Sequence, residues 1–429
     1  MYISQCLIVK NEEENIEHCL GHLKSVVNEQ IVVDTGSTDR TVEIAEKMGA
    51  KVFHFNWVDD FSAARNYAIG KAKGDWIIFL DCDEYFSEDS VLRLKRYMKI
   101  WVKDKNVDGI MCQMFNIDKN NNPIGIVNNI SPRIFKNKKY LRYKNRIHEA
   151  LNNLCRSKGK LTIGDAGNDI VIYHTGYDKG VVEEKSKIER NIHMIKSSID
   201  ESPGDSKMYY YLSNEYFRLG KHEDAIKSAY EALVYKKKDD IESHYPLIYR
   251  NILRSMHSMS APASDVKKEF SKAITEYPEY PDYYYIMGLA LLRENEADEA
   301  IVCLEKCIKL CESYKMIIES NAVANIEDVY TALIQAYILA DNKLRVVELC
   351  AVVLKVDKYN YQILRVLINT FLSGEKEESI FEFFKKIYSY DIFKDKLYLL
   401  KASEQNNSKK LTDLYMNLLT REELKAIEK

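Results

Sequence analysis

The sequence predicts an α/β domain with a mostly parallel sheet, followed by an all-α array of helices. Before about residue 175, short β-branched or aromatic segments alternate with amphipathic helical segments and turns. Beyond that point the chain has long helical periods, many Lys and Glu residues and little glycine. Small and apolar residues then recur at offsets of about 34 residues, which is typical of helical repeats.

The composition of the 429-residue chain argues against several classes of protein. Its net charge of −3 provides no basic field for nucleic acid or for an anionic membrane. Nine cysteines are scattered without a paired framework, which favours a reducing compartment over secretion. The first 20 residues are too charged for a secretory signal, and no apolar run reaches the ~20 residues that span a bilayer. We therefore expect a cytoplasmic protein with no transmembrane segment and no nucleic-acid partner.

The first 55 residues contain a β-α-β-α-β pattern with short connections. In chain order, strands are expected at 3–9, 30–34 and 51–55, and helices at 16–23 and 41–48. Such units predict a parallel sheet with right-handed crossovers. Asp34 ends the second strand, at the sheet edge where ligands bind in open α/β folds. A turn or helix cap is the alternative role for this carboxylate.

A short apolar strand at 76–80 ends abruptly in the carboxylates of Asp81 and Asp83. Two carboxylates this close repel each other unless a cation neutralises them. Hard oxygen ligands suit Mg²⁺ or Mn²⁺, particularly when substrate phosphates supply the remaining ligands. The pattern therefore favours a divalent metal site that holds a diphosphate, and a plain surface turn is the alternative.

A helix that opens at residues 60–68 leads to this strand and carries Arg65. A guanidinium in this place can pair in a bidentate way with a carboxylate or with a diphosphate. The alternative is an ordinary surface arginine.

Four short motifs follow one another in the first fifth of the chain: Leu7–Glu12, Val33–Asp39, Ala64–Asn66 and Phe79–Glu84. In this order they resemble family 2 glycosyltransferases with the GT-A fold. Four motifs in register are more specific than any one of them alone. The resemblance implies an inverting transferase that takes a sugar from a nucleotide donor and uses a divalent metal, Mn²⁺ or Mg²⁺.

The resemblance also implies roles for individual residues. The residues that bind the nucleotide sugar would be Val9, Asn11, Glu12, Asp34, Arg65 and Asp81. Among them, Asp34 would contact the base, and Asp81 would face the ribose or the metal. Asp83 would hold the metal on the diphosphate.

A second charged cluster consists of Arg146, His148 and Glu149. Inverting transfer needs a general base near the anomeric carbon of the donor, and a carboxylate can take this role. The Arg-x-His-Glu arrangement resembles a subset of family 2 enzymes and favours Glu149 as the base, with His148 as the competing candidate. A structural salt bridge between Glu149 and Arg146 is the alternative.

A strand at 170–173 ends in His174 and closes the first domain. A neutral imidazole is a suitable ligand for Mn²⁺. Related GT-A enzymes place a late histidine beside the acidic pair, so the resemblance makes His174 a further metal ligand with Asp83 and Asp81. A single histidine at a strand end is otherwise more often structural.

The remaining chain resembles a degenerate tetratricopeptide array. We expect a GT-A domain at 1–177, a connecting helix at 178–204, repeats at 205–390 and capping or dimerisation helices at 391–429. A single unit cannot bury its apolar face, so the units stack and leave a concave surface that suits a polypeptide.

The combination of domains gives three hypotheses of function. The first is an inverting, metal-dependent transferase that moves glucose or N-acetylglucosamine from a UDP donor onto a polypeptide. Such fusions resemble bacterial protein and peptide glycosyltransferases that modify flagellin or secreted peptides. The second replaces the acceptor by a growing glycan or cell-surface polysaccharide, with the repeats docking a partner. The third is a scaffold with an inactive transferase domain, and a homodimer is compatible with all three.

Overall fold

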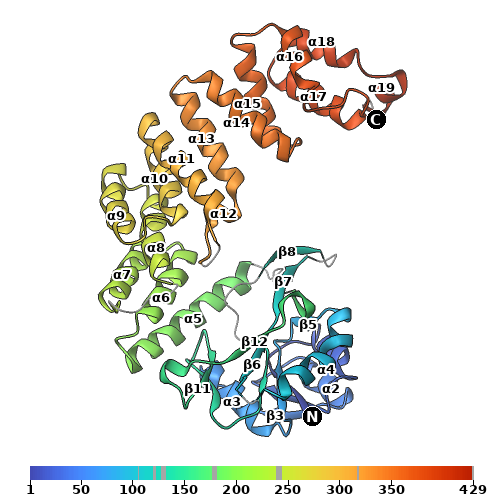
Figure 1. Cartoon of the computed structure of the whole chain (residues 1–429), viewed down its shortest axis with the longest axis vertical. Helices are drawn as coiled ribbons and strands as arrows, with labels where there is room; N and C mark the ends of the chain where they lie inside the picture. Colours follow the sequence, from blue (N-terminus) through green and yellow to red (C-terminus); the bar gives the residue numbers. More distant parts are fainter. Residues whose placement is uncertain are drawn as a thin grey trace. The chain divides into compact units, whose positions relative to one another are not determined.

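The computed structural model describes residues 1–104, 106–118, 122–126, 132–175, 181–237, 244–315 and 318–427. Its packing divides the chain into two compact units, residues 1–219 and 220–429. The first unit contains an α/β domain and two further helices, and the described part of the second unit is helical (Figure 1). The predicted order, an α/β domain followed by an all-α array, is confirmed.

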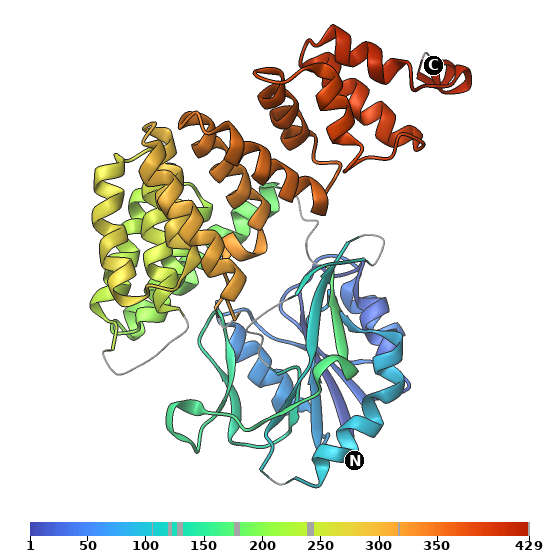
Figure 2. The ribbon, with the colours of Figure 1, turned by 45° about the horizontal axis from the view of Figure 1, so that its top comes forward.

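A seven-stranded sheet of order β12-β6-β9-β4-β1-β2-β3 forms the centre of the first unit (Figure 2). Its strands are β1 (Ile3–Val9), β2 (Glu29–Asp34), β3 (Lys51–His54), β4 (Trp76–Phe79), β6 (Gly109–Met111), β9 (Ile134–Lys136) and β12 (Ile163–Asp165). Strand β1 pairs in parallel with β2 and β4, and β2 pairs in parallel with β3. Strand β9 runs antiparallel to β4 and β6, which makes the sheet mixed.

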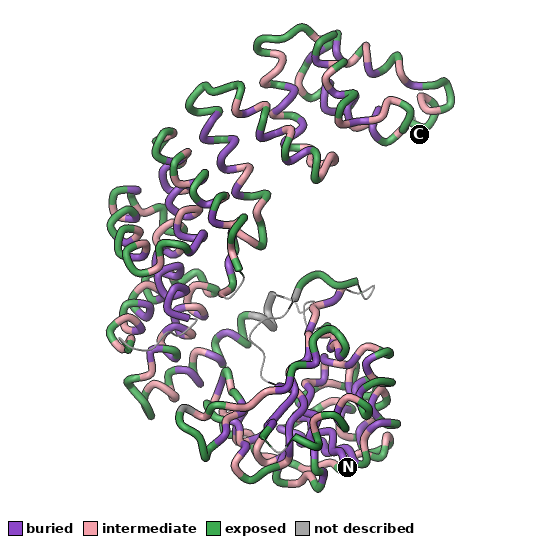
Figure 3. Tube along the Cα trace, in the orientation of Figure 1, coloured by how far each residue is buried: buried purple, intermediate pink, exposed green. Residues whose placement is uncertain are grey.

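Helices cover both faces of this sheet. They are α1 (Ile16–Leu23), α2 (Thr41–Lys47), α3 (Phe61–Lys71) and α4 (Glu88–Val102). Neighbouring residues of β1 join different cores: Leu7 packs in a cluster with Leu20 of α1, and Cys6 packs in another cluster with Ala68 of α3. This explains why β1, β2 and β4 are rich in apolar residues and lie buried along their length (Figure 3).

A smaller sheet of order β5-β13-β7-β8 lies beside the first one in the chain's α/β domain. Its strands are β5 (Glu84–Phe86), β13 (Val171–His174), β7 (Gln113–Ile117) and β8 (Pro123–Ile126), and a separate hairpin consists of β10 (Leu141–Lys144) and β11 (Ala150–Asn153). Two 3-10 turns lie at Ser157–Gly159 and Gly167–Asp169. The register pairs His174 with Glu84 on one side and with Asn116 on the other. The sheet thereby brings three polar residues from distant segments into one row.

Two helices beyond the sheets also belong to the first unit. Helix α5 (Val181–Glu201) corresponds to the predicted connecting helix, and α6 (Ser206–Arg218) follows it. Met194 of α5 and Met208 of α6 share one apolar cluster with Ile147 of the α/β domain. The compact first unit therefore extends past residue 204, while the predicted functional boundaries at 177, 204 and 390 remain predictions.

The second unit is built from short antiparallel helices. In chain order they are α7 (His222–Val234), α8 (Tyr245–Ser258), α9 (Ala263–Glu276), α10 (Pro281–Arg293), α11 (Ala297–Ser313), α12 (Asn321–Ala324), α13 (Ile326–Leu339), α14 (Lys343–Val356), α15 (Tyr361–Leu372), α16 (Glu377–Phe384), α17 (Phe393–Gln405), α18 (Lys409–Met416) and α19 (Arg421–Ile427). A Cβ on Gly288 of α10 would lie 2.6 Å from Leu304 of α11, so the close helix pair requires glycine there. Within the described ranges, none of the helices combines the length and the apolar character needed to cross a bilayer.

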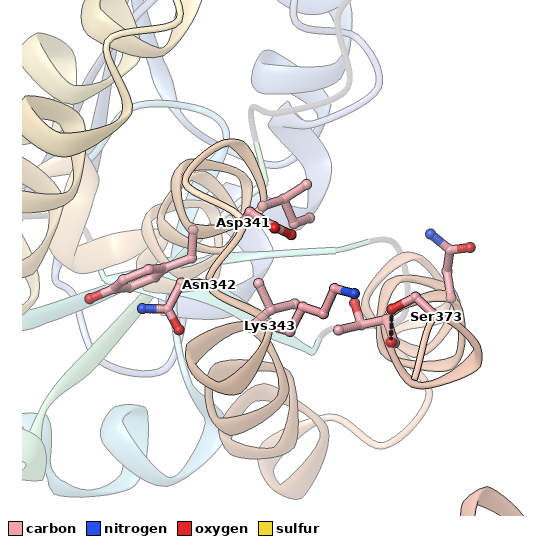
Figure 4. A pocket seen from close by; sticks show the side chains of 9 residues that line it. Asp341, Asn342, Lys343 and Ser373 are labelled. Atoms are coloured by element: carbon pink, nitrogen blue, oxygen red, sulfur yellow. Dashed lines mark hydrogen bonds between the residues drawn. The ribbon is translucent and has the colours of Figure 1, made fainter. Parts of the chain in front are cut away.

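A pocket of ≈ 140 Å³ lies among α13, α14 and α15, where Lys343 extends toward Ser373 (Figure 4). Polar groups of this pocket form hydrogen bonds within the helices. The side chain of Asn342 accepts from the N–H of Arg345 at 3.2 Å and caps α14. The Ser373 hydroxyl donates to the carbonyl of Thr370 at 2.6 Å. We interpret this pocket as a groove between neighbouring helices.

Asp282→Ala is expected to destabilise the second unit by about 3 kcal/mol. Asp282 is 1% exposed and accepts hydrogen bonds from the Ser320 hydroxyl and from the N–H groups of Asn321 and Ala322 at 3.0 Å each. Its loss leaves the buried donors of Ser320 and Ala322 without this acceptor. Urea denaturation of the full chain measures the effect, and the exposed Asp413 provides an Asp→Ala control that should change little.

Candidate active site

Three adjacent strands of the large sheet end in predicted site residues. Val9 ends β1 and pairs in register with Asp34, which ends β2. Asp81 follows β4, the other neighbour of β1. Because these strands are parallel, their carboxyl ends meet at the sheet edge where ligands bind in α/β folds. The expected grouping of Val9, Asp34 and Asp81 is thus present.

Asp34 closes a tight turn at this edge. It is 5% exposed and accepts from the N–H groups of Gly36 at 3.2 Å and Ser37 at 2.9 Å, while His54 Nδ1 lies 3.3 Å away. Burial favours a higher pKa for this carboxyl, but the hydrogen bonds from Ser37, His54 and Gly36 lower the pKa overall. Asp34 therefore acts as an ionised turn residue, and contact with a base stays a prediction.

Asn11 connects the first motif to this turn. Its backbone is left-handed, with φ 56°, and its N–H donates to Ser37 Oγ at 3.0 Å. Its side-chain oxygen accepts from the N–H of Thr38 at 2.8 Å, and the N–H of Glu12 donates to Thr41 Oγ1 at 2.7 Å. The loops that follow β1 and β2 therefore form one wall beside Asp34.

Five charged side chains form a row of ion pairs in which acids and arginines alternate. Glu149 accepts from Arg65 Nε at 2.7 Å, and Arg65 Nη2 donates to Asp81 at 2.8 Å. The other oxygen of Asp81 accepts from Arg133 Nη2 at 3.1 Å, and Arg133 Nε donates to Glu84 at 2.8 Å. We call these five residues the charge chain.

Burial and pairing have opposite effects on the acids of the charge chain. Burial favours a raised pKa for Asp81, but the guanidinium groups of Arg65 and Arg133 lower its pKa to about 2. Burial raises the pKa of Glu84, and Arg133 offsets this only in part. Since both oxygens of Asp81 accept from arginines, a metal ion at Asp81 would compete with two cations.

Asp83 and His174 form a separate pair. His174 Nε2 lies 3.4 Å from Asp83 Oδ2, and His174 Nδ1 lies 2.8 Å from Asn116 Oδ1. When Nδ1–H donates to Asn116, the Nε2 lone pair faces a carboxylate, and a cation between them is favoured. The Asp83 hydrogen bond accordingly raises the pKa of His174, although burial acts in the opposite direction.

The donor atoms of this pair fit a divalent ion. Adjacent ligands of an octahedral ion with bonds of about 2.1 Å lie about 3.0 Å apart, close to the separation of Asp83 and His174. Among the described residues, however, no group of three or more His, Cys, Asp or Glu side chains is arranged to hold a metal. Substrate oxygens would have to complete the coordination.

The two candidate bases have different surroundings. Glu149 has a side chain that is 14% exposed and pairs with Arg65, whereas Arg146 pairs with Glu201 of α5. The structural alternative of an Arg146–Glu149 bridge is therefore wrong. His148 has a left-handed backbone, with φ 52°, and its ring lies away from the charge chain, against α6.

Acidification is expected to destabilise the first unit, partly through His148. Desolvation, then the charges of Lys207 and Arg218, lowers the pKa of His148 from 6.5 to about 4. Between pH 6.5 and about pH 4, His148 therefore binds a proton in the unfolded chain but not in the folded one. The free energy of unfolding falls as the pH drops through this range. The contribution should stay below ~1 kcal/mol: the stack on Tyr211 desolvates one face of the ring, but the residue as a whole is exposed and solvent screens its charge. Melting temperatures at pH 7 and pH 5 should differ less in His148→Phe than in the unmodified protein, and equal differences would contradict this.

Sequence reasoning missed Arg133 and Asn116. Arg133 precedes β9, and its carbonyl accepts from the N–H of Phe79 at 2.8 Å because β9 pairs with β4. Asn116 reaches His174 only through the pairing of β7 with β13. The available signal was indirect: the carboxylates of Asp81 and Glu84 lie only three residues apart, so more than one cation was needed to neutralise them.

Comparisons with known proteins agree with these features. The family model described as glycosyl transferase family 2 matches residues 4–159, and a tetratricopeptide repeat model matches residues 281–314. A TPR repeat-containing protein of Synechococcus elongatus is 32% identical over 234 residues, which cover 53% of this chain and 54% of the relative. The SPbeta prophage-derived glycosyltransferase SunS of Bacillus subtilis is 27% identical over 293 residues, which cover 67% and 66% respectively. The matches thus span between about half and two thirds of the length of these relatives.

Two solved structures are similar to parts of the chain. The crystal structure of S. aureus TarS 1-349 in complex with UDP-GlcNAc has a TM-score of 0.37 and 14% identity, covering 65% of this chain and 92% of that one. The crystal structure of the MamA protein has a TM-score of 0.33 and 19% identity, covering 41% and 86%. The repeat match coincides with α10 and α11, one of the predicted repeats. Residues 4–159 thus match the family 2 glycosyltransferase model, and the same chain matches a tetratricopeptide repeat at residues 281–314.

Proposed function

We propose that the chain transfers a sugar from a nucleotide diphosphate donor onto a polypeptide, with inversion at the anomeric carbon. The observation that carries this proposal is the convergence of three groups at one sheet edge. These groups are the Asp34 turn, the charge chain and the Asp83–His174 pair. The donor would be UDP-linked glucose or N-acetylglucosamine, as in enzymes with the same motifs.

Arg65 is the residue best suited to meet the donor. Two of its nitrogens bind Glu149 and Asp81, but its buried Nη1 has no acceptor among the described residues. A buried guanidinium nitrogen without an acceptor is costly, and a phosphate or hydroxyl oxygen of the donor would satisfy it. The faces of Phe79 and Tyr143 flank the guanidinium carbon at 4.9 and 5.4 Å and fix its plane.

Asp83 and His174 would hold the divalent ion, with Asp81 as a further ligand when substrate displaces an arginine. When bound, the ion would offset the negative charge that develops on the departing diphosphate. Asn116 keeps Nε2 of His174 directed at Asp83. Mn²⁺ and Mg²⁺ both accept this combination of ligands.

Glu149 would take the proton of the acceptor, with His148 as the other candidate. The bond from Arg65 holds the Glu149 carboxylate in a defined orientation, which a general base requires. The same arginine binds Asp81, so one residue would set the distance between the base and the donor side of the site.

The polypeptide acceptor is inferred from the helical array. Tetratricopeptide-like units stack and present extended surfaces that usually bind polypeptide. The family match and the repeat match occur on one chain, which favours an enzyme that holds its own acceptor.

Mass spectrometry tests the proposed function directly. The full chain is incubated with Mn²⁺, a panel of nucleotide sugars and candidate polypeptides, and intact masses are recorded. Addition of one hexose or N-acetylhexosamine to a polypeptide is the expected result. Transfer to a glycan but to no polypeptide would support the glycan alternative. Neither transfer nor hydrolysis of any nucleotide sugar would point to a scaffold.

A further inference from the structure

The loop at residues 145–149, between β10 and β11, is held by helices on two sides. The N–H of Phe61, at the start of α3, donates to the carbonyl of Arg146 at 2.8 Å. The side chain of Arg146 forms an ion pair with Glu201 on α5. Ile147 is 5% exposed and packs in the apolar cluster that α5 and α6 share with this loop. The loop is therefore fixed by long-range contacts.

The next residue, His148, meets α6. Its ring is stacked on Tyr211, with ring centroids 3.7 Å apart and planes 21° apart. The backbone of His148 has φ 52°, a conformation that L-residues maintain mainly where their surroundings impose it. Tyr211 also packs against the apolar cluster, so its own position is set by α5 and α6. The stacked ring is the contact that restrains His148.

The loop ends at the charge chain. Glu149 directly follows His148 and accepts from Arg65 at 2.7 Å. Because Cα atoms of consecutive residues are a fixed ~3.8 Å apart, the position of His148 limits where Glu149 can lie. The α5–α6 helix pair therefore acts on the position of the candidate base through the stack of Tyr211 on His148, in addition to the contacts of Arg146 and Ile147.

We infer that Tyr211 is a positioning residue of the transfer site: its ring holds His148 and thereby places Glu149 against Arg65. The expected effect of Tyr211 on turnover rests on the proposed function. The expected effect of Tyr211 on the order of the loop does not depend on that function. The first helix after the connecting helix thus belongs to the same compact unit as the transfer site.

Hydrogen exchange in the full-length protein tests the ordering of the loop. Tyr211→Ala should speed amide exchange in peptides that cover residues 57–66 and 143–152, because the Phe61 amide depends on the loop carbonyl. Tyr211→Phe should restore slow exchange, since it keeps the ring. Tyr216→Ala is the matched control: it removes the same atoms from the same helix and the same cluster, where Tyr216 lies beneath Lys196. Unchanged exchange in Tyr211→Ala, or equal acceleration in Tyr216→Ala, would overturn the inference.

Kinetics of UDP-sugar hydrolysis separate positioning from the proposed function. Tyr211→Ala should lower kcat about tenfold or more with little change in the donor KM, because ~1 Å of misplacement can cost 100-fold. Tyr211→Phe should recover the activity, and Tyr216→Ala should keep it at a similar melting temperature. Loss of kcat in both Ala variants would reject positioning. If the unmodified protein neither hydrolyses nor transfers any nucleotide sugar, the proposed function fails, and the exchange experiment still decides the role of Tyr211.

Discussion

Asp83→Asn is expected to lower sugar transfer about 1000-fold and to leave the fold intact. The amide keeps the size of the side chain but loses the charge that faces His174 Nε2 at 3.4 Å. A neutral oxygen binds a divalent ion weakly, so the departing diphosphate loses its stabilisation. Transfer rates at saturating donor, together with Mn²⁺ titration by calorimetry, measure both consequences.

Asp89→Asn is the matched control for this prediction. Asp89 lies six residues further along, with a side chain that is 80% exposed, and pairs only loosely with Arg93 at 3.8 Å. This variant should bind Mn²⁺ and transfer sugar like the unmodified protein. Full activity of Asp83→Asn with unchanged Mn²⁺ affinity would remove the metal from the proposed mechanism.

Glu149→Gln should lower turnover by a similar factor, about 1000-fold, because the acceptor proton would have no base. The amide oxygen can still accept from Arg65 Nε, so the loop should stay in place and the melting temperature should change little. Single-turnover rates with saturating donor and acceptor report the chemical step, and donor affinity measured separately should be nearly unchanged.

His148→Phe decides between the two candidate bases. It removes both ring nitrogens but keeps a ring that can stack on Tyr211. If Glu149 is the base, this variant retains most of the turnover. The reverse outcome, in which His148→Phe is inactive and Glu149→Gln is active, would assign the base to His148.

The sequence was sufficient to predict the parallel part of the sheet and its ligand-binding edge. Asp34 and Asp81 each follow a buried apolar strand, and short helical connections make those strands parallel. Both signals are local, since they depend on side-chain periodicity and connection length. The same reasoning predicted the repeat that contains Gly288, whose missing side chain allows α10 and α11 to approach.

The sequence did not predict which side chains pair with the site residues. Arg65 was predicted as a donor ligand, and it also binds Glu149, which lies 84 residues further along the chain. Arg133 reaches Asp81 only because β9 enters the sheet antiparallel beside β4. Tyr211 stacks on His148, which precedes it by 63 residues, and only the packing of α6 against the loop at residues 145–149 brings the two rings together.

The amino-acid sequence by itself therefore determined which helices and strands form and which carboxylates lie at the strand ends, because the periodicity of helices and strands depends on neighbouring residues. Only the tertiary structure decided which cation meets which acid, and that a helix beyond the sheets supports the candidate base. Those contacts depend on strand order and on packing between distant segments, which no local pattern of residues records.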